Sequence, residues 1–142
     1  MSDLVSENLN MIFKSPKGET VHALKDLNFT IKKGELLTVL GPSGCGKTTL
    51  LNIAAGFIRP TSGTITLGNN EINGPGVDRG MVFQQGALFE WLTVSENVNF
   101  GLRMKKKDPI ETQKKVDEWL EIVGLKGFGN TCLLYTSPSP RD

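Results

Sequence analysis

One stretch of the sequence has residue types and spacing suited to binding phosphate. Residues Gly41–Thr48 read GPSGCGKT, which fits the pattern G-x-x-x-x-G-K-[ST]. The three glycines of this stretch let the backbone curl into a concave nest whose N–H groups point at phosphate oxygens. The sequence therefore predicts a phosphate-binding loop (P-loop) formed by Gly41, Pro42, Ser43, Gly44, Cys45 and Gly46.

The residues that follow the loop supply the charge and the hydroxyl groups that a bound nucleoside triphosphate needs. Lys47 can reach the β- and γ-phosphates as a flexible cation, so we expect it to be catalytic as well as nucleotide-binding. The Thr48 hydroxyl is predicted to ligate Mg²⁺, and Thr49 is predicted to contact the α-phosphate. The N-terminus of the following helix adds the positive end of its dipole.

A phosphate-binding loop has to lie between a strand and a helix, and the flanking sequence predicts both. Residues 35–40, ELLTVL, are a nearly continuous apolar run and are expected to form a strand buried on both faces. A helix is expected from about Lys47 to Ala55, where Gly56 ends it. Three more short strands are expected at Leu27–Ile31, Gly63–Leu67 and Gly80–Phe83.

The sequence after Leu92 predicts two helices. Thr93 and Glu96 have the spacing of a capping box, which opens a helix that runs to about Met104. The pair Asp108-Pro109 is a strong start for a second helix, which ends at Gly124. We expect this helix to bury one side, and we expect Trp91 and Trp119 to be packing residues; the buried side comprises Val116, Trp119, Leu120 and Val123.

Composition narrows the class of protein. The 142 residues suffice for one ordinary domain, and the formal net charge is only +1, so nucleic acid is not expected as a partner. The N-terminus lacks the order of a signal peptide, and two cysteines do not make a disulfide scaffold. A cytoplasmic protein is therefore expected.

The P-loop alone does not distinguish GTPases, kinases and transport ATPases, but its surroundings do. The stretches ALKDLNFTIKKGELLTVLGPSGCGKTTLLNIAAGFIRPTSGTITL and GVDRGMVFQQGALFEWLTVSENVNFGL closely resemble the ATP-binding subunits of ABC transporters. INGPGVDRGMVFQ is most similar to the branch that serves nitrate, sulfonate and taurine importers. The resemblance runs from about Phe13 to Leu125. It implies an α/β fold of the P-loop NTPase type, with a truncated parallel core, an antiparallel β-subdomain and the start of a helical subdomain.

The resemblance also implies roles for residues outside the P-loop. Gln84 matches the family's Q-loop and would approach Mg²⁺ and the attacking water, which makes it a catalytic residue and a metal ligand. Phe13 stands where the family places an aromatic ring that stacks on the adenine of ATP, although it can equally be a core residue. The segment Gly86–Thr93 corresponds to the surface that receives a coupling helix from the membrane subunit.

Several of the family's motifs do not occur in this sequence. An LSGGQ-type signature, the apolar Walker B strand ending in Asp-Glu and the switch histidine all belong to the family's C-terminal half, and none of them is present. Residues 132–142, CLLYTSPSPRD, match in back-translation a transposase-type sequencing adaptor read in one frame. We therefore expect residues 1–131 to be the N-terminal part of an ABC ATPase domain and residues 132–142 to be non-native. This chain alone is expected to be inactive.

The intact protein is expected to be a peripheral subunit on the inner face of the cell membrane. Its implied partners are a second ATP-binding subunit, the transmembrane permease subunits and, indirectly, an extracytoplasmic solute-binding protein. Two alternatives remain open: a short ATP-binding module without turnover, and an ABC ATPase outside transport. The transported solute cannot be read from these residues. A GTPase is disfavoured because the guanine-reading Asn-Lys-x-Asp motif does not occur.

Overall fold

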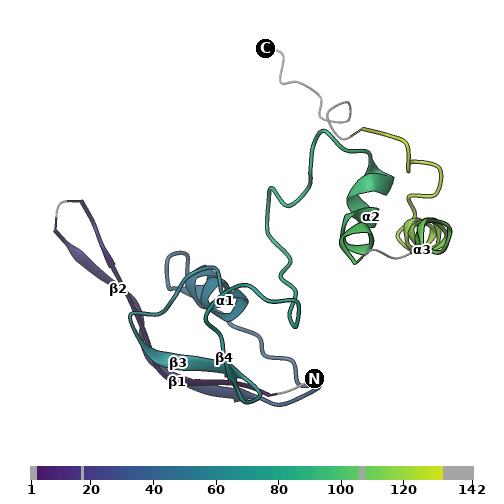
Figure 1. Ribbon diagram of the computed structural model, residues 1–142. Coiled ribbons are helices and arrows are strands. Elements are labelled where there is room, and N and C mark those ends of the chain that lie inside the picture. The colour runs from purple at the N-terminus through teal and green to yellow at the C-terminus, as the bar shows by residue number, and fades with distance from the viewer. Residues whose placement is uncertain (1–2, 17, 106–107, 133–142) are drawn as a thin grey trace, which may run out of the picture. The chain divides into compact units, whose positions relative to one another are not determined.

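The structure, a computed structural model, describes residues 3–16, 18–105 and 108–132. The chain divides into two units, Met1–Met81 and Val82–Asp142 (Figure 1). Most of the segment that we interpret as non-native, residues 133–142, lies outside the described residues. None of the helices in the described part of the chain is long and apolar enough to cross a membrane.

The first unit is built on a four-stranded antiparallel sheet in the order β2-β1-β3-β4 (Figure 1). β1 is paired along its length with β2, from Leu4 opposite Ile31 to Lys14 opposite Thr20. The connection between β3 and β4 is short. The bounds of the strands are β1 Leu4–Lys14, β2 Thr20–Ile31, β3 Ser62–Leu67 and β4 Asn70–Glu71.

One helix, α1 (Lys47–Ala55), packs on this sheet and closes the core of the first unit. Its Leu50 and Ile53 are buried against the inward-facing side chains of the strands. The spacing of three residues places both side chains on one face of the helix. The core cluster of the first unit consists of Leu9, Leu24, Leu50, Ile53, Ile65 and Ile72.

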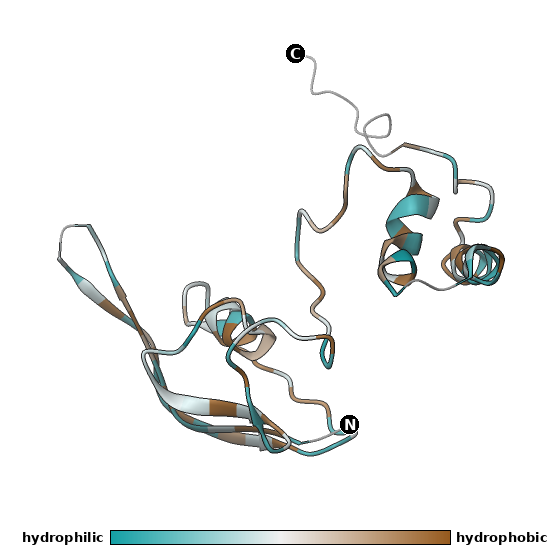
Figure 2. Cartoon of the chain, viewed as in Figure 1, coloured by the Kyte–Doolittle hydropathy of each residue, from teal (hydrophilic) through white to brown (hydrophobic). Residues whose placement is uncertain are grey.

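The expected antiparallel strands are confirmed, but the expected strands at 35–40 and 80–83 are wrong. Residues 27–31 lie within β2 and residues 63–67 within β3, whereas residues 35–40 and 80–83 are irregular. Leu36 is 93% exposed and Leu40 is 87% exposed, so the apolar run before α1 is not buried. Figure 2 shows the hydropathy along the chain, with hydrophobic residues in brown. A strand needs a hydrogen-bonded neighbour, and no described segment of this chain pairs with either stretch. The expected parallel core is therefore not formed among the described residues.

The second unit contains two helices, α2 (Val94–Met104) and α3 (Pro109–Ile122), whose predicted starts are confirmed. The hydroxyl of Thr93 accepts a hydrogen bond from the Glu96 N–H, and the Thr93 N–H donates to the Glu96 carboxylate at 2.8 Å. The Asp108 carboxylate accepts hydrogen bonds from two backbone N–H groups in the first turn of α3. Gly124 follows α3 with a left-handed φ of 75°, as its predicted place at the helix end requires.

The buried side of α3 is narrower than the sequence suggested. Thr112, Val116 and Leu120 are buried, at intervals of four residues. Trp119 is 42% exposed and Val123 is also exposed, so their expected burial is wrong. Trp119 lies at the edge of the buried line, about 60° around the helix from Val116, and Val123 lies beyond the last residue of α3, Ile122. Trp91 is likewise exposed, although its ring contacts that of Phe89 with centroids 5.5 Å apart, so neither tryptophan is buried within the described residues.

Candidate functional site

The P-loop connects the irregular segment 35–40 to α1, and its glycines permit its shape. Gly44 and Gly46 have φ values of 81° and 95°, in the left-handed region that favours glycine. Gly46 also packs directly on β2, since a Cβ at this position would lie 2.3 Å from the Ala23 carbonyl oxygen. At Gly41 a Cβ would lie 2.6 Å from the sulfur of Cys45. The loop therefore holds a tight curl that larger residues at 41 and 46 would disrupt.

The ammonium group of Lys47 lies inside this curl. Its Nζ donates hydrogen bonds to the carbonyl oxygens of Gly41 at 2.7 Å and of Pro42 at 2.6 Å. It also lies 3.4 Å from the sulfur of Cys45. An ammonium group has three donors, and sulfur is the weakest of these three acceptors. A phosphate oxygen that approached Lys47 would therefore displace the Cys45 contact at the smallest cost.

The N-terminus of α1 is suited to an anion. Gly46 is the N-cap, no side chain caps the helix, and its first turn contains no acidic residue. The first backbone N–H groups and the positive end of the helix dipole therefore face no competing carboxylate from α1. Thr48 is exposed and Thr49 is half-buried in this same turn. The structure thus brings together the P-loop residues, Lys47, Thr48 and Thr49, as the sequence predicted.

A cavity of about 340 Å³ lies beside the loop. Residues of the P-loop line part of its wall, and hydrophobic side chains line the rest: Leu24, Leu27, Val39, Leu40 and Leu50. Val39 and Leu40 thus stand next to the P-loop although their segment is not a strand. A wall of this kind suits hydrophobic packing and not a phosphate group.

The other two predicted site residues lie apart from the P-loop in the sequence. Phe13 is near the end of β1 in the first unit, is 43% exposed and is not a member of the core cluster. Gln84 belongs to the second unit and is exposed. The P-loop belongs to the first unit and Gln84 to the second, so they form two separate groups of candidate residues.

Sequence reasoning did not identify Asn97, which holds the segment before α2 in place. Its Oδ1 accepts a hydrogen bond from the Phe89 N–H at 2.8 Å, and its Nδ2 donates to the Phe89 carbonyl oxygen at 3.0 Å. Nδ2 also lies within hydrogen-bonding distance of the carbonyl oxygens of Leu92 and Thr93. Asparagine is an unfavourable residue inside a helix. Its presence at position 97 of a predicted helix is therefore the sequence feature that points to a hydrogen-bonding role. This one side chain thus fixes the backbone around Trp91, which is 71% exposed.

Comparison with solved structures supports this arrangement of elements. The structure matches the ATP-binding cassette MJ0796 in a dimeric post-hydrolysis state bound to ADP and Pi, with a TM-score of 0.77 and 34% sequence identity. The match covers 89% of this chain and 60% of that chain. A second dimeric structure of MJ0796, described as a bacterial ABC transporter cassette, matches equally well.

Curated relatives give a consistent result. The chain is 83% identical over 131 residues to the taurine import ATP-binding protein TauB of Pelagibacter ubique, which covers 92% of this chain and 49% of that protein. It is 56% identical over 128 residues to TauB of Roseobacter denitrificans, with 90% and 48% covered. The chain therefore spans about half the length of the curated relatives that it matches.

The family model for ABC transporters matches residues 24–138, a range that includes the P-loop, α1 and both helices of the second unit. This range is well over half of the sequence. Together with the fold of the two units and the geometry of the P-loop, it shows that the chain belongs to the ABC transporter family.

Proposed function

We propose that this chain binds the triphosphate of ATP through Gly41–Thr49. The observation that carries the proposal is the position of Lys47, whose ammonium group lies within the curl of the loop at the uncapped N-terminus of α1. This arrangement combines a mobile cation, free backbone donors and a helix dipole around one point. Adenine would stack on the half-exposed ring of Phe13.

Mg²⁺ is the second component of the proposed site. The exposed hydroxyl of Thr48 follows Lys47 directly in the first turn of α1, where it can ligate an ion that also contacts the phosphates. Gln84 is proposed as a further ligand and as the residue that orients the attacking water. Mg²⁺ would supply charge neutralisation at the β- and γ-phosphates, while the loop and Lys47 bind and orient them.

For the intact protein we propose the role of ATP-binding subunit of an importer. Support comes from the TauB proteins, whose names assign them to taurine import, and taurine or a related sulfonate is the solute that we propose. The dimeric cassette structures support a second ATP-binding subunit as a partner. Transmembrane permease subunits would contact the segment Gly86–Thr93 from the membrane, and a solute-binding protein would act outside it.

The proposal is tested by ATP affinity in the presence of Mg²⁺. Lys47→Ala removes the cation from the loop, so we expect affinity to fall by at least about tenfold, the effect of one charged hydrogen bond of 1.5 kcal/mol or more. Lys33→Ala is the matched control, because Lys33 is an exposed lysine in the turn after β2. Equal affinity of the wild-type chain and the Lys47→Ala variant, with both folded, would refute the phosphate-binding role of the loop.

A further inference from the structure

The β1–β2 hairpin that carries Phe13 extends beyond the other two strands of the sheet (Figure 1). The pairing of β1 with β3 reaches only to Asn10, opposite Ser62, whereas the pairing of β1 with β2 continues to Lys14. Among the described residues, the outer part of the hairpin therefore has no third strand beside it. Its direction depends on the contacts made where β3 begins.

The ladder between β1 and β2 changes register at the same point. Met11 lies opposite Leu24 and Ile12 lies opposite His22, so Ala23 is an extra residue of β2, a β-bulge. Neighbouring residues of a strand point to opposite faces of the sheet, so a change of register by one residue changes which side chains share a face. This bulge therefore decides which side chains of β2 lie beside those of the outer part of β1.

The bulge is also the point at which the hairpin touches the P-loop. A Cβ at Gly46, the N-cap of α1, would lie 2.3 Å from the carbonyl oxygen of Ala23. The backbone of the bulge thus packs directly on the phosphate-binding loop. The position of the Phe13 ring relative to the P-loop consequently depends on how the hairpin is held at this bulge.

The hydroxyl group of Thr61 contacts both residues of β1 at the bulge. It accepts a hydrogen bond from the Ile12 N–H at 2.9 Å, and it lies 3.7 Å from the sulfur of Met11. The Thr61 N–H donates to the carbonyl oxygen of Asn10 at 2.9 Å. Thr61 directly precedes β3, which begins at Ser62. This one residue therefore extends the contact between β3 and β1 as far as the bulge.

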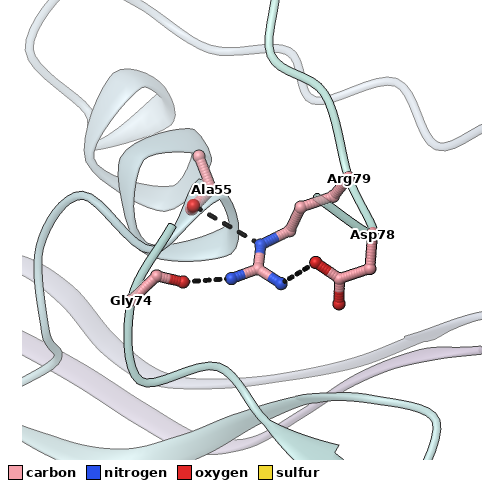
Figure 3. A network of polar contacts seen from close by, with 4 residues as sticks. All are labelled: Ala55, Gly74, Asp78 and Arg79. Carbon is pink, nitrogen blue, oxygen red and sulfur yellow. Dashed lines mark hydrogen bonds and ion pairs between the residues drawn. The ribbon is translucent and has the colours of Figure 1, made fainter. Parts of the chain in front are cut away.

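The helix that follows the P-loop is held by other contacts at its far end. Nε of Arg79 donates to the carbonyl oxygen of Ala55, the last residue of α1, at 3.4 Å, and Nη2 donates to the carbonyl oxygen of Gly74 (Figure 3). Nη1 forms an ion pair with Asp78 at 2.7 Å. None of these three contacts involves Thr61, so loss of the Thr61 hydroxyl should loosen the hairpin without releasing α1.

We infer that Thr61 is a positioning residue for the base of ATP: its hydroxyl holds the hairpin so that the ring of Phe13 can stack on adenine. The inference rests on the proposed binding of ATP, with adenine on Phe13. Thr61 does not touch the nucleotide in this scheme, since its hydroxyl contacts Ile12 and Met11. Its loss should therefore weaken the binding of a ligand that has a base and spare the binding of the phosphate chain alone.

The test compares ATP with tripolyphosphate, which has no base, as calorimetric ligands of the 142-residue chain in the presence of Mg²⁺. Thr61→Val keeps the shape of the side chain and removes the hydroxyl. We expect it to weaken ATP binding by about threefold, within the range for the loss of an aromatic stacking pair. Tripolyphosphate should bind this variant and the wild-type chain equally. Thr61→Ser retains the hydroxyl and should bind ATP as the wild-type chain does.

Thr30→Val is the matched control. Thr30 is an exposed threonine of β2 that lies opposite Val5, away from the bulge, so its replacement should leave both affinities unchanged. The second control combines Thr61→Val with Phe13→Ala. If Thr61 acts through the ring, Thr61→Val should have no further effect on ATP affinity once the ring has been removed.

The inference is overturned if Thr61→Val binds ATP as tightly as the wild-type chain, or if it weakens ATP and tripolyphosphate equally. A further loss of ATP affinity in the absence of the Phe13 ring would also overturn it. A Phe13→Ala variant that binds ATP as tightly as the wild-type chain refutes adenine stacking instead, and the inference with it. A wild-type chain that binds neither ligand refutes the proposed function as a whole.

Discussion

Phe13 and Val21 are directly opposite each other in the β1–β2 ladder, and both side chains are exposed, by 43% and 58%. Directly opposite residues of an antiparallel pair project from the same face of the sheet. The aromatic ring therefore has an aliphatic neighbour on one side and solvent on the other. A flat ring in this position is available for stacking on a nucleotide base.

Phe13→Ala should weaken ATP binding without removing the contacts to the phosphates. We expect a loss of about 0.5–1.5 kcal/mol, the range for an aromatic stacking pair. Calorimetry with ATP measures this loss, and tripolyphosphate, which has no base, should bind both proteins equally. Val21→Ala is the control from the same face of the sheet, and it should leave ATP affinity unchanged. An unaltered ATP affinity in Phe13→Ala would exclude stacking by this ring.

Asn97→Ala should destabilise the second unit, because it leaves the Phe89 N–H without its acceptor and removes the side-chain donor from the carbonyl oxygens of Phe89 and Thr93. The expected cost is about 1–3 kcal/mol. Both tryptophans lie in the second unit, so urea unfolding followed by tryptophan fluorescence reports on it.

Asn99→Ala provides the comparison for Asn97. Asn99 lies two positions along the same helix, and its Oδ1 is buried without a hydrogen-bond partner among the described residues. Its replacement should change the free energy of unfolding by no more than about 0.5 kcal/mol, or should stabilise the unit. If the two substitutions lowered the free energy of unfolding equally, the hydrogen bonds of Asn97 would not be the cause of its effect on stability.

The stability of the first turn of α2 should decrease at acid pH, because the Glu96 carboxylate that caps it becomes protonated there. The backbone N–H of Thr93, which donates to the Glu96 carboxylate, is the main reason that the pKa of Glu96 lies below its ordinary value of 4.5, and the Thr93 hydroxyl adds to this effect. A lowered pKa in the folded state means that the carboxylate stabilises the folded state. This stabilisation is complete above the ordinary pKa and is lost as the pH falls from about 4.5 through the lowered value.

Carboxyl chemical shifts measured during an acid titration give the pKa of Glu96 directly. In Glu96→Gln the side chain still accepts a hydrogen bond but does not titrate. The part of the acid-induced loss of α2 helicity that is due to Glu96 should therefore be absent in this variant. A Glu96 pKa at or above the ordinary value would contradict the capping-box effect.

The 142-residue chain should not hydrolyse ATP above the level of its Lys47→Ala variant. Hydrolysis needs a positioned water and charge stabilisation around the transferring phosphoryl group. The chain offers the P-loop, Lys47, Thr48 and Gln84, whereas the sequence contains no signature motif or Walker B carboxylate. Release of phosphate from purified protein measures this directly. Steady release that disappears in Lys47→Ala would require a catalytic carboxylate among residues 1–142.

The sequence by itself determined the features that depend on neighbours in the chain. The P-loop is specified by closely spaced glycines and Lys47, and α1 has the bounds that were predicted. The capping residues Thr93 and Asp108 act within their own first turns, so their geometry needs no distant contact. The capping hydrogen bonds span two or three residues, and those of Lys47 within the P-loop span five or six, so sequence patterns of this length can specify them.

Tertiary structure decided the features that need a partner from elsewhere in the chain. β1 lies between β2 and β3 in the sheet. Its buried and exposed residues do not alternate regularly, because its ladder with β2 is irregular between Ser6 and Leu9, both of which are buried. The run at 35–40 has the composition of a buried strand, yet a strand is formed only where a neighbour satisfies its N–H and C=O groups. Its state therefore depends on which segments are available to pair with it.

The contacts of Arg79 and Asn97 also arise only in three dimensions. Arg79 reaches a carbonyl group 24 residues earlier in the sequence, and Asn97 accepts from an N–H group eight residues earlier. No residue pattern marks such pairs, because the same side chains elsewhere are ordinary surface groups. The packing of α1 on the sheet and the turn before α2 bring the partners together, and that is why only the folded chain reveals them.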